Sequence, residues 1–156
     1  MSLAREPIIT AATAALRAHG LAGLSMRRLA QELGVQPGAL YYHVASKQDL
    51  VAAAGESILA AAGEVSADPA RAAEEFRALL LGVRDGAEVI SFVYAYRPAA
   101  LAPFENLGDT LTRYVLGFVA VEQNHAELVR ARIAKPTPPE DDAFRTGVRA
   151  ILRGLS

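Results

Sequence analysis

The sequence predicts an all-α protein, with a helix-turn-helix domain of three helices at the N-terminus and a second helical domain behind it. Alanine and leucine dominate, β-branched residues are sparse outside 115–121, and no useful stretch alternates polar and apolar residues as a strand does. Apolar residues recur at helical spacing instead. With 156 residues, 52% of them hydrophobic, the chain can bury a sizeable core without disulfides or a metal.

The first three predicted helices cover residues 7–19, 25–34 and 37–44. Proline suits a first helical turn and glycine ends a helix, so Pro7 and Gly20 delimit the first helix. Ser25 is a good N-cap for the second helix, and Gly34 ends it. The third helix separates into two faces. We expect one to be buried (Pro37, Leu40, Tyr41, Val44) and the other to point outward (Gly38, Ala39, Tyr42, His43).

Further helices are predicted at 46–65, 70–83, 86–96, 108–126 and 142–155. Pro98 and Pro103 indicate a loop, and the prolines of 135–140 indicate a linker. Asp68-Pro69 is the clearest boundary. We therefore expect a DNA-binding domain at 1–48, a connecting helix at 49–66 and an effector-binding and dimerisation domain at 67–156.

Composition excludes several classes of protein. Cysteine is absent, which excludes a disulfide scaffold and thiolate chemistry. The first residues have no apolar signal core, and no apolar run approaches the roughly 18 residues of a membrane span, so we expect a soluble, cytoplasmic protein without a membrane partner. No phosphate-binding loop or nucleophile motif is present, so we expect no enzyme.

Charge is divided unevenly along the chain. Residues 1–48 carry five basic and two acidic residues, a net +3, whereas the remainder carries eleven basic and fifteen acidic residues, a net −4. A basic head on an acidic body fits a module that binds a polyanion, although ordinary scatter would also produce this difference.

Residues 24–47 carry the pattern with the clearest chemical meaning. They predict two helices joined by a short glycine turn, which frees the second helix to enter a DNA major groove about 12 Å wide. Gly38 and Ala39 are small enough for close approach to base edges, and Tyr42 and His43 offer a polar edge. Lys47 and Arg27 can meet phosphate or guanine. The alternative is an ordinary solvent-exposed face.

The stretch 24–50 resembles the helix-turn-helix of the TetR family of bacterial transcription repressors, most clearly in Leu-Tyr-Tyr-His-Val-x-x-Lys at 40–47. The resemblance implies contacts with a palindromic double-stranded DNA operator from a set of eight residues: Ser25, Arg27, Gln36, Gly38, Ala39, Tyr42, His43 and Lys47. Pro37, Ala39 and Tyr42 depart from the family pattern, so the operator sequence does not transfer.

The C-terminal part is similar to the tetracycline-repressor subclass in four places: 84–87, 97–98, 117–125 and 144–154. That subclass uses a histidine shortly after Arg-Asp-Gly-Ala to help hold magnesium-bound drug, and Ile90 occupies this place here. We therefore predict no metal, no cofactor and no metal-tetracycline binding. Glu122 and His125 are three residues apart on one helix face, where a salt bridge or solvated face is favoured over a ligand pair.

The resemblance implies a homodimer joined by a four-helix bundle of the last two helices. The predicted interface consists of Tyr114, Phe118, Val121, Phe144, Val148, Ile151, Leu152 and Leu155. The helix at 108–126 is apolar nearly all round and is therefore expected to be buried on all sides. The alternative is that both stripes form the core of one subunit.

Aromatic residues around the proline-bearing loop, with one cation, predict a pocket for a small apolar or aromatic effector. The predicted pocket residues are Phe92, Tyr94, Arg97, Phe104 and Phe118. Plain packing is the alternative. A ligand that prefers the conformation unable to bind DNA would release the operator.

The sequence thus predicts a ligand-responsive repressor, or a small-molecule-sequestering protein whose DNA-binding head has no function. It leaves open the operator, the effector, the regulated genes and whether transcription is repressed or activated. The junction 104–109 is shorter than in the family that it resembles, as if a helix and its loop were skipped. Residues absent near 104–109 and 132–142 would explain this, and Cα separations near 3.8 Å throughout would refute it.

Overall fold

The computed structural model describes residues 4–155, and over this range it is all-helical. The helices are α1 (Arg5–Gly23), α2 (Met26–Glu32), α3 (Pro37–Tyr41), α4 (Lys47–Ala60), α5 (Pro69–Leu81), α6 (Gly86–Tyr96), the 3-10 helix η1 (Pro98–Leu107), α7 (Gly108–Arg130) and α8 (Asp141–Leu155). The predicted fold class is confirmed, with every predicted helix present and boundaries shifted by a few residues.

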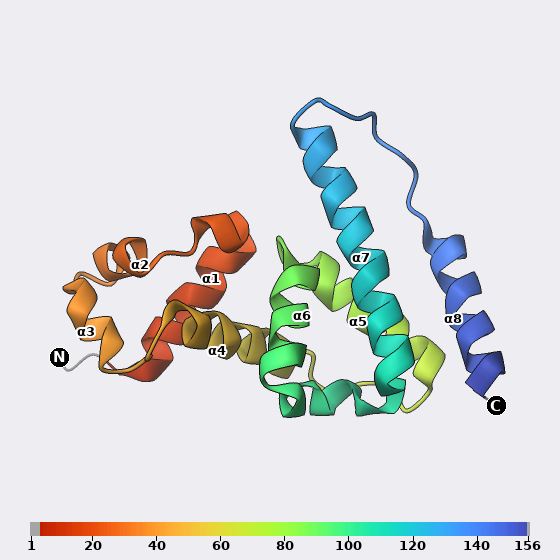
Figure 1. The fold of residues 1–156 in the computed structure, drawn as a ribbon, viewed down its shortest axis with the longest axis horizontal. Coiled ribbons are helices and arrows are strands. Elements are labelled where there is room, and N and C mark those ends of the chain that lie inside the picture. Colours follow the sequence, from red (N-terminus) through yellow and green to blue (C-terminus); the bar gives the residue numbers. More distant parts are fainter. Residues whose placement is uncertain (1–3, 156) are drawn as a thin grey trace.

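The helices form a head and a body that are joined by α4 (Figure 1). The head consists of α1 to α3, and α4 runs from it toward the body and packs on both α1 and α6. The body consists of α5 to α8. The body packs tightly on α4 at Gly55, where an added Cβ would lie 2.5 Å from a Val93 methyl. A larger side chain at this position would push α4 away from α6.

Gly20 and Asp85 make a second contact between head and body. Gly20 has φ +66°, which kinks α1 near its end, and Asp85 precedes α6 with φ +57°. The Leu21 backbone N–H donates to Asp85 Oδ2 at 2.8 Å. The kink therefore turns an amide that the helix would otherwise use toward a carboxylate of the body.

The region around Pro98 and Pro103 differs from the prediction of a loop. It forms η1, whose end leads directly into α7, with the Gly108 N–H donating to the Glu105 carbonyl. Proline is compatible with this helix because it occupies its first turn and a kinked stretch next to Phe104. The linker after α7 is extended as predicted and leads to α8 without regular structure between 135 and 140.

Candidate DNA-binding interface

The turn between α2 and α3 is fixed by local hydrogen bonds. Ser25 Oγ caps α2 by accepting the Arg28 N–H at 3.1 Å. At the other end, Gly34 adopts φ +67°, a left-handed conformation that favours glycine, and the Val35 N–H donates to the Ala30 carbonyl at 2.9 Å. These bonds end α2 sharply and set the direction in which α3 leaves the turn.

Buried leucine and valine side chains hold α3 on the head. Leu40 and Val44 are buried in the cluster that also contains Leu29 and Met26 of α2. The buried face of α3 is narrower than predicted, because Tyr41 is 53% exposed and Pro37 is also exposed. A helix of five residues has one buried stripe only, so the placement of Tyr41 and Pro37 in the core was wrong.

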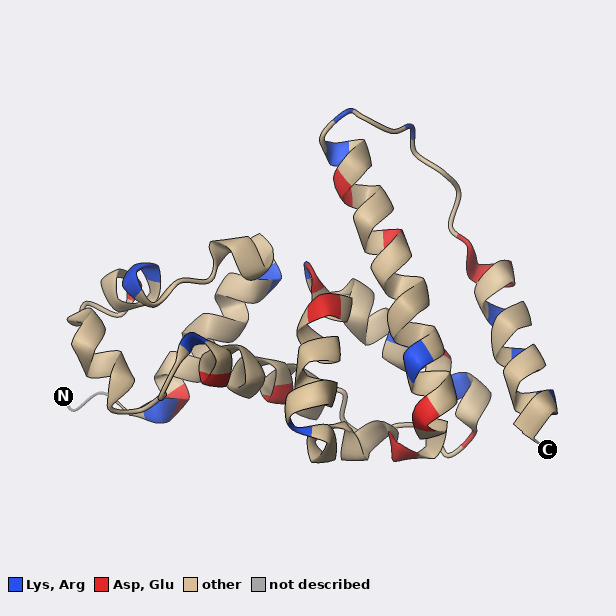
Figure 2. Cartoon of the chain, in the orientation of Figure 1, with Lys and Arg blue, Asp and Glu red and all other residues tan. Residues whose placement is uncertain are grey.

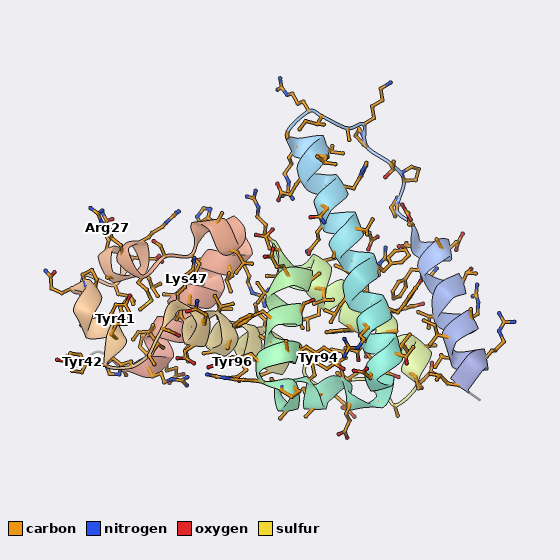
Figure 3. The ribbon with its side chains drawn as sticks, in the orientation of Figure 1. Arg27, Tyr41, Tyr42, Lys47, Tyr94 and Tyr96 are labelled. Carbon is orange, nitrogen blue, oxygen red and sulfur yellow. The ribbon has the colours of Figure 1, made fainter. Side chains whose placement is uncertain are left out.

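The outward face of α3 carries the side chains that were expected to reach DNA. Tyr42 is 90% exposed, and an added Cβ on Gly38 would meet no atom within 4 Å. Arg27 projects from α2, and Figure 3 shows Arg27 and Tyr42 at the end of the head that points away from the body. Of the eight predicted DNA-contacting residues, six are exposed (Ser25, Arg27, Gln36, Gly38, Tyr42, Lys47) and two are half-buried (Ala39, His43).

Lys47 is the first residue of α4 and lies where unpaired backbone N–H groups of that helix point outward. Ser46 caps the helix, since its Oγ accepts the Asp49 N–H at 3.1 Å and its hydroxyl donates to Asp49 Oδ2. An exposed ammonium beside a helix N-terminus is a favourable arrangement for phosphate. Figure 2 shows basic groups at the start of α4 and on α2, in the same head as α3.

Asp49 is a residue of this region that the sequence did not single out. Its Oδ1 accepts hydrogen bonds from Arg97 Nη2 at 3.0 Å and from the Tyr96 hydroxyl at 3.1 Å, so the end of α6 is tied to the first turn of α4. The hydrogen bonds from Ser46 and then Tyr96, together with the nearby Arg97 charge, lower the pKa of Asp49 below 3.8. These contacts join residues about fifty positions apart, so no local pattern could have indicated them.

The five predicted effector residues do not line one pocket, and this prediction is corrected. Phe104 is buried and packs on Phe76 in a tilted arrangement with ring centroids 4.6 Å apart, while Arg97 pairs with Asp49 and Glu56 of α4. Phe118 of α7 packs on Phe144 of α8. Phe92 stacks on Tyr96 and lines a small cleft between head and body. Only Tyr94 and Phe104 share a hollow, which measures about 430 Å³.

The predicted dimer residues also divide. Phe144 and Val148 lie in the core of the subunit at 0% and 2% exposure, so direct contact of these two with a partner is corrected. Tyr114 and Phe118 are half-buried against Phe144 at 5.8 and 5.2 Å. Only Val121 and Leu155 of the eight are exposed, at 69% and 63%. Ile151 and Leu152 are half-buried. Within a single subunit α7 is not buried on all sides, since Val121 is exposed, and the burial of this face by a partner stays a prediction.

The structure pairs Glu122 and His125 with different partners. Glu122 binds the guanidinium of Arg77, a partner that the sequence did not indicate, and a ring nitrogen of His125 lies 3.1 Å from the Lys135 carbonyl. Ile90 is fully buried and offers no ligand atom. Within residues 4–155, no cluster of three or more His, Asp or Glu side chains is arranged to hold a metal ion. No helix in the same range has the length and apolar character needed to cross a membrane.

A short helix held at a fixed angle on a three-helix head, with its outer face free and cations beside it, defines a helix-turn-helix DNA-binding module. The family described as bacterial regulatory proteins, tetR family, matches residues 8–54. Tetracycline repressor protein class D of Escherichia coli is 43% identical over 202 aligned positions, covering 98% of this chain and 89% of that protein. The chain therefore belongs to the TetR family of DNA-binding transcriptional regulators.

Solved structures agree with this assignment over the whole length. Mycobacterium smegmatis BioQ is 31% identical with a TM-score of 0.80, covering 98% of each chain, and BioQ with its double-stranded DNA operator gives a TM-score of 0.76. A variant of TetR from Acinetobacter baumannii AYE in complex with minocycline is 25% identical and has a TM-score of 0.75. The match covers 98% of this chain and 96% of that one. The 202 positions of the class D alignment exceed the 156 residues of this chain, so that repressor contains stretches without a counterpart here.

Proposed function

We propose that the chain is a repressor that binds a palindromic double-stranded DNA operator as a homodimer and is released by a small-molecule effector. The observation that carries this proposal is the free outer side of α3 and its C-cap, where Tyr42 is 90% exposed while Leu40 of α3 is fully buried. The operator bound to BioQ, at 31% identity, supports the same use of this face.

The eight candidate DNA residues fall into two roles in this proposal. Gly38 and Ala39 on α3, Tyr42 and His43 directly after it, and Arg27 on α2 read base edges. Ser25, Gln36 and Lys47 position the head on the phosphate backbone, since each lies at a helix N-terminus or its cap. The corresponding functional division is 1–48 for DNA, 49–66 for the connection and 67–156 for the effector and the dimer. Residues 1–3 and Ser156 lie outside the described range.

One recognition helix reads only a few base pairs, so two copies are needed, set about 34–36 Å apart on successive major grooves. We place the second copy on the surface formed by α7 and α8, centred on Val121 and Leu155 with Ile151 and Leu152. Tyr114 and Phe118 lie beneath this surface and hold α8 on α7 through their contacts with Phe144. The minocycline bound to the Acinetobacter baumannii relative supports a body that takes small molecules.

Selection of bound fragments from a random DNA pool, followed by gel shifts, tests the DNA-binding function. We expect a palindromic sequence. Arg27→Ala should weaken specific binding by about 1–3 kcal/mol if Arg27 contacts a base, and Tyr42→Ala should also weaken it. Arg17→Ala, on the exposed part of α1, is the matched control. Failure to enrich any sequence would instead favour a small-molecule-sequestering protein whose head does not bind DNA.

Light scattering tests the dimer. Val121→Glu and Leu155→Glu place a charge in the proposed interface and should yield monomers, because burying an unpaired charge is costly. Leu81→Glu is the control, since Leu81 is 44% exposed on α5, outside the proposed interface. A wild-type chain that is monomeric at micromolar concentration, or a dimer that both variants leave intact, would contradict this interface.

A further inference from the structure

The hollow shared by Tyr94 and Phe104 lies where the end of α6, η1 and the first turns of α7 meet. Pro98, Leu101 and Phe104 give it apolar walls, and its volume of about 430 Å³ lies within the range of about 300–1,000 Å³ found for small-molecule sites. Figure 3 shows Tyr94 projecting from α6 toward α7 on this side of the body.

Thr112 supplies a hydroxyl to this hollow. It is 4% exposed and is the one buried polar residue in the described chain, and its hydroxyl has no hydrogen-bond partner there. No fully enclosed side-chain nitrogen or oxygen in residues 4–155 lacks a partner. The Thr112 hydroxyl is therefore not sealed in the core. It reaches the open space that the residue lines, where a ligand can satisfy it.

The charge of the hollow is negative. Glu105 and Asp109 line it, and none of its lining residues is Lys, Arg or His. Asp109 is already paired, since Arg113 Nε lies 2.8 Å from its Oδ2 and the Tyr94 hydroxyl donates to its other oxygen. Glu105 has no ion-pair or hydrogen-bond partner for its carboxylate among residues 4–155. One uncompensated carboxylate at the edge of an apolar hollow favours a cation.

We propose that this hollow binds a small apolar molecule carrying an amine, whose ammonium group pairs with Glu105 and donates a hydrogen bond to the Thr112 hydroxyl. The proposal rests on the proposed function insofar as it makes this molecule the effector. Pro98 lines the hollow, and the preceding Arg97 holds Asp49 and Glu56 of α4. A ligand that shifts Pro98 thus acts directly on the connection to the helix that begins at Lys47.

The test measures binding to the full chain without DNA, by ligand-observed NMR titration. The probes are three molecules of nearly equal size: 2-phenylethylamine, 2-phenylethanol and phenylacetate. We expect the amine to bind more tightly than the alcohol, and phenylacetate to bind most weakly. Binding of the amine no tighter than that of the alcohol, or preferential binding of phenylacetate, would overturn the proposal, as would no detectable binding of the amine.

Three variants locate the site. Glu105→Gln should weaken amine binding by about threefold to fivefold and leave the alcohol unchanged, as expected for an exposed ion pair. Thr112→Val, which has nearly the same shape, should weaken amine binding by about threefold to tenfold through the lost hydrogen bond. Glu6→Gln removes the same charge from exposed α1 and should change neither. Unchanged amine binding in both Glu105→Gln and Thr112→Val would place the amine elsewhere and overturn the site.

A gel shift with selected operator DNA separates this site from the proposed function. Addition of 2-phenylethylamine should reduce the bound fraction for the wild-type chain, and Glu105→Gln should require a correspondingly higher concentration. If the chain binds no operator, the proposed function fails while the DNA-free titration still tests the site. If the amine binds but the operator is retained, the effector role of the hollow is refuted.

Discussion

Arg97 Nη2 lies 3.0 Å from Asp49 Oδ1, which joins the end of α6 to the first turn of α4. Arg97 also pairs at 3.1 Å with Glu56, the neighbour of the Gly55 that packs against Val93. Head and body are therefore connected by a small polar cluster beside a tight apolar contact. Arg97 is the residue between α6 and η1, so the cluster ties the junction of these two helices to α4.

Replacement of Arg97 by methionine should loosen this connection. We expect the free energy of unfolding to fall by only about 1 kcal/mol, because the pairs are partly exposed. The amides of the first turns of α4 should exchange with solvent measurably faster, since that end loses its contact with the body. Hydrogen exchange measures this locally, and Arg113→Met, which removes an exposed pair within α7, is the control. Equal exchange in both variants would contradict the role of Arg97.

Asp49 should contribute to the acid sensitivity of the fold. Its pKa is lowered in the folded chain, first by the Ser46 and Tyr96 hydrogen bonds, relative to the ordinary value of 3.8. The stabilisation is thus fully present above pH 3.8 and is lost as the pH falls through the folded pKa. Thermal melts between about pH 2.5 and 6 should show a shallower acid decline for Asp49→Asn. Glu32→Gln, on exposed α2, serves as the reference, and identical slopes for Asp49→Asn and wild type would exclude the contribution.

The kink at Gly20 should not tolerate a side chain. Alanine at φ +66° is strained, and its Cβ would clash with Asp85 Oδ2, which displaces the acceptor of the Leu21 N–H. Chemical denaturation should show a loss of about 2 kcal/mol or more for Gly20→Ala.

Gly117→Ala provides the matched comparison. This glycine lies inside α7, and an added Cβ would meet nothing within 4 Å, so the substitution should raise stability by up to about 1 kcal/mol. A Gly20→Ala protein as stable as wild type would mean that the kink is not required for the fold.

Sequence reasoning predicted the elements whose signals are local. Ser25, Gly34 and Ser46 mark helix ends by their own chemistry, and each acts as a cap or a turn in the structure. The outward placement of Tyr42 followed from helical spacing alone. Tyr41 was misplaced because spacing does not reveal how short α3 is, and a short helix buries only Leu40 in its second turn.

The contacts between distant segments could not be predicted in the same way. Phe104 was assigned to a ligand pocket as an aromatic residue near prolines, yet it packs on Phe76 in the core, because η1 folds back onto α5. Likewise, Phe144 belongs to an apolar stripe on α8, and such a stripe could pack on a partner as well as on its own subunit. Only the position of α7 decides which surface covers it, and that position depends on ion pairs such as Arg77 with Glu122 that leave no periodic trace.

Arg77 should be the most sensitive charged position of the body. Its side chain is 12% exposed, donates to Glu122 through Nε at 2.9 Å and to Asp141 through Nη1 at 2.7 Å, and lies over the Phe144 ring at 4.9 Å. It thereby fastens α8 to α5 and α7. Arg77→Met should cost about 3–5 kcal/mol, because Glu122 keeps its charge at 17% exposure without a partner.

The double variant Arg77→Met with Glu122→Leu distinguishes a lost ion pair from a stranded charge. Removing both charges should recover a large part of the stability lost in Arg77→Met, since a nearly buried pair can be replaced by apolar side chains at little cost. Arg145→Ala, which breaks the half-exposed pair between α8 and Glu74 of α5, should change the free energy of unfolding by less than about 1 kcal/mol. Urea denaturation of the three proteins measures these differences. A double variant no more stable than Arg77→Met would show that Arg77 acts through its packing on Phe144 rather than through Glu122.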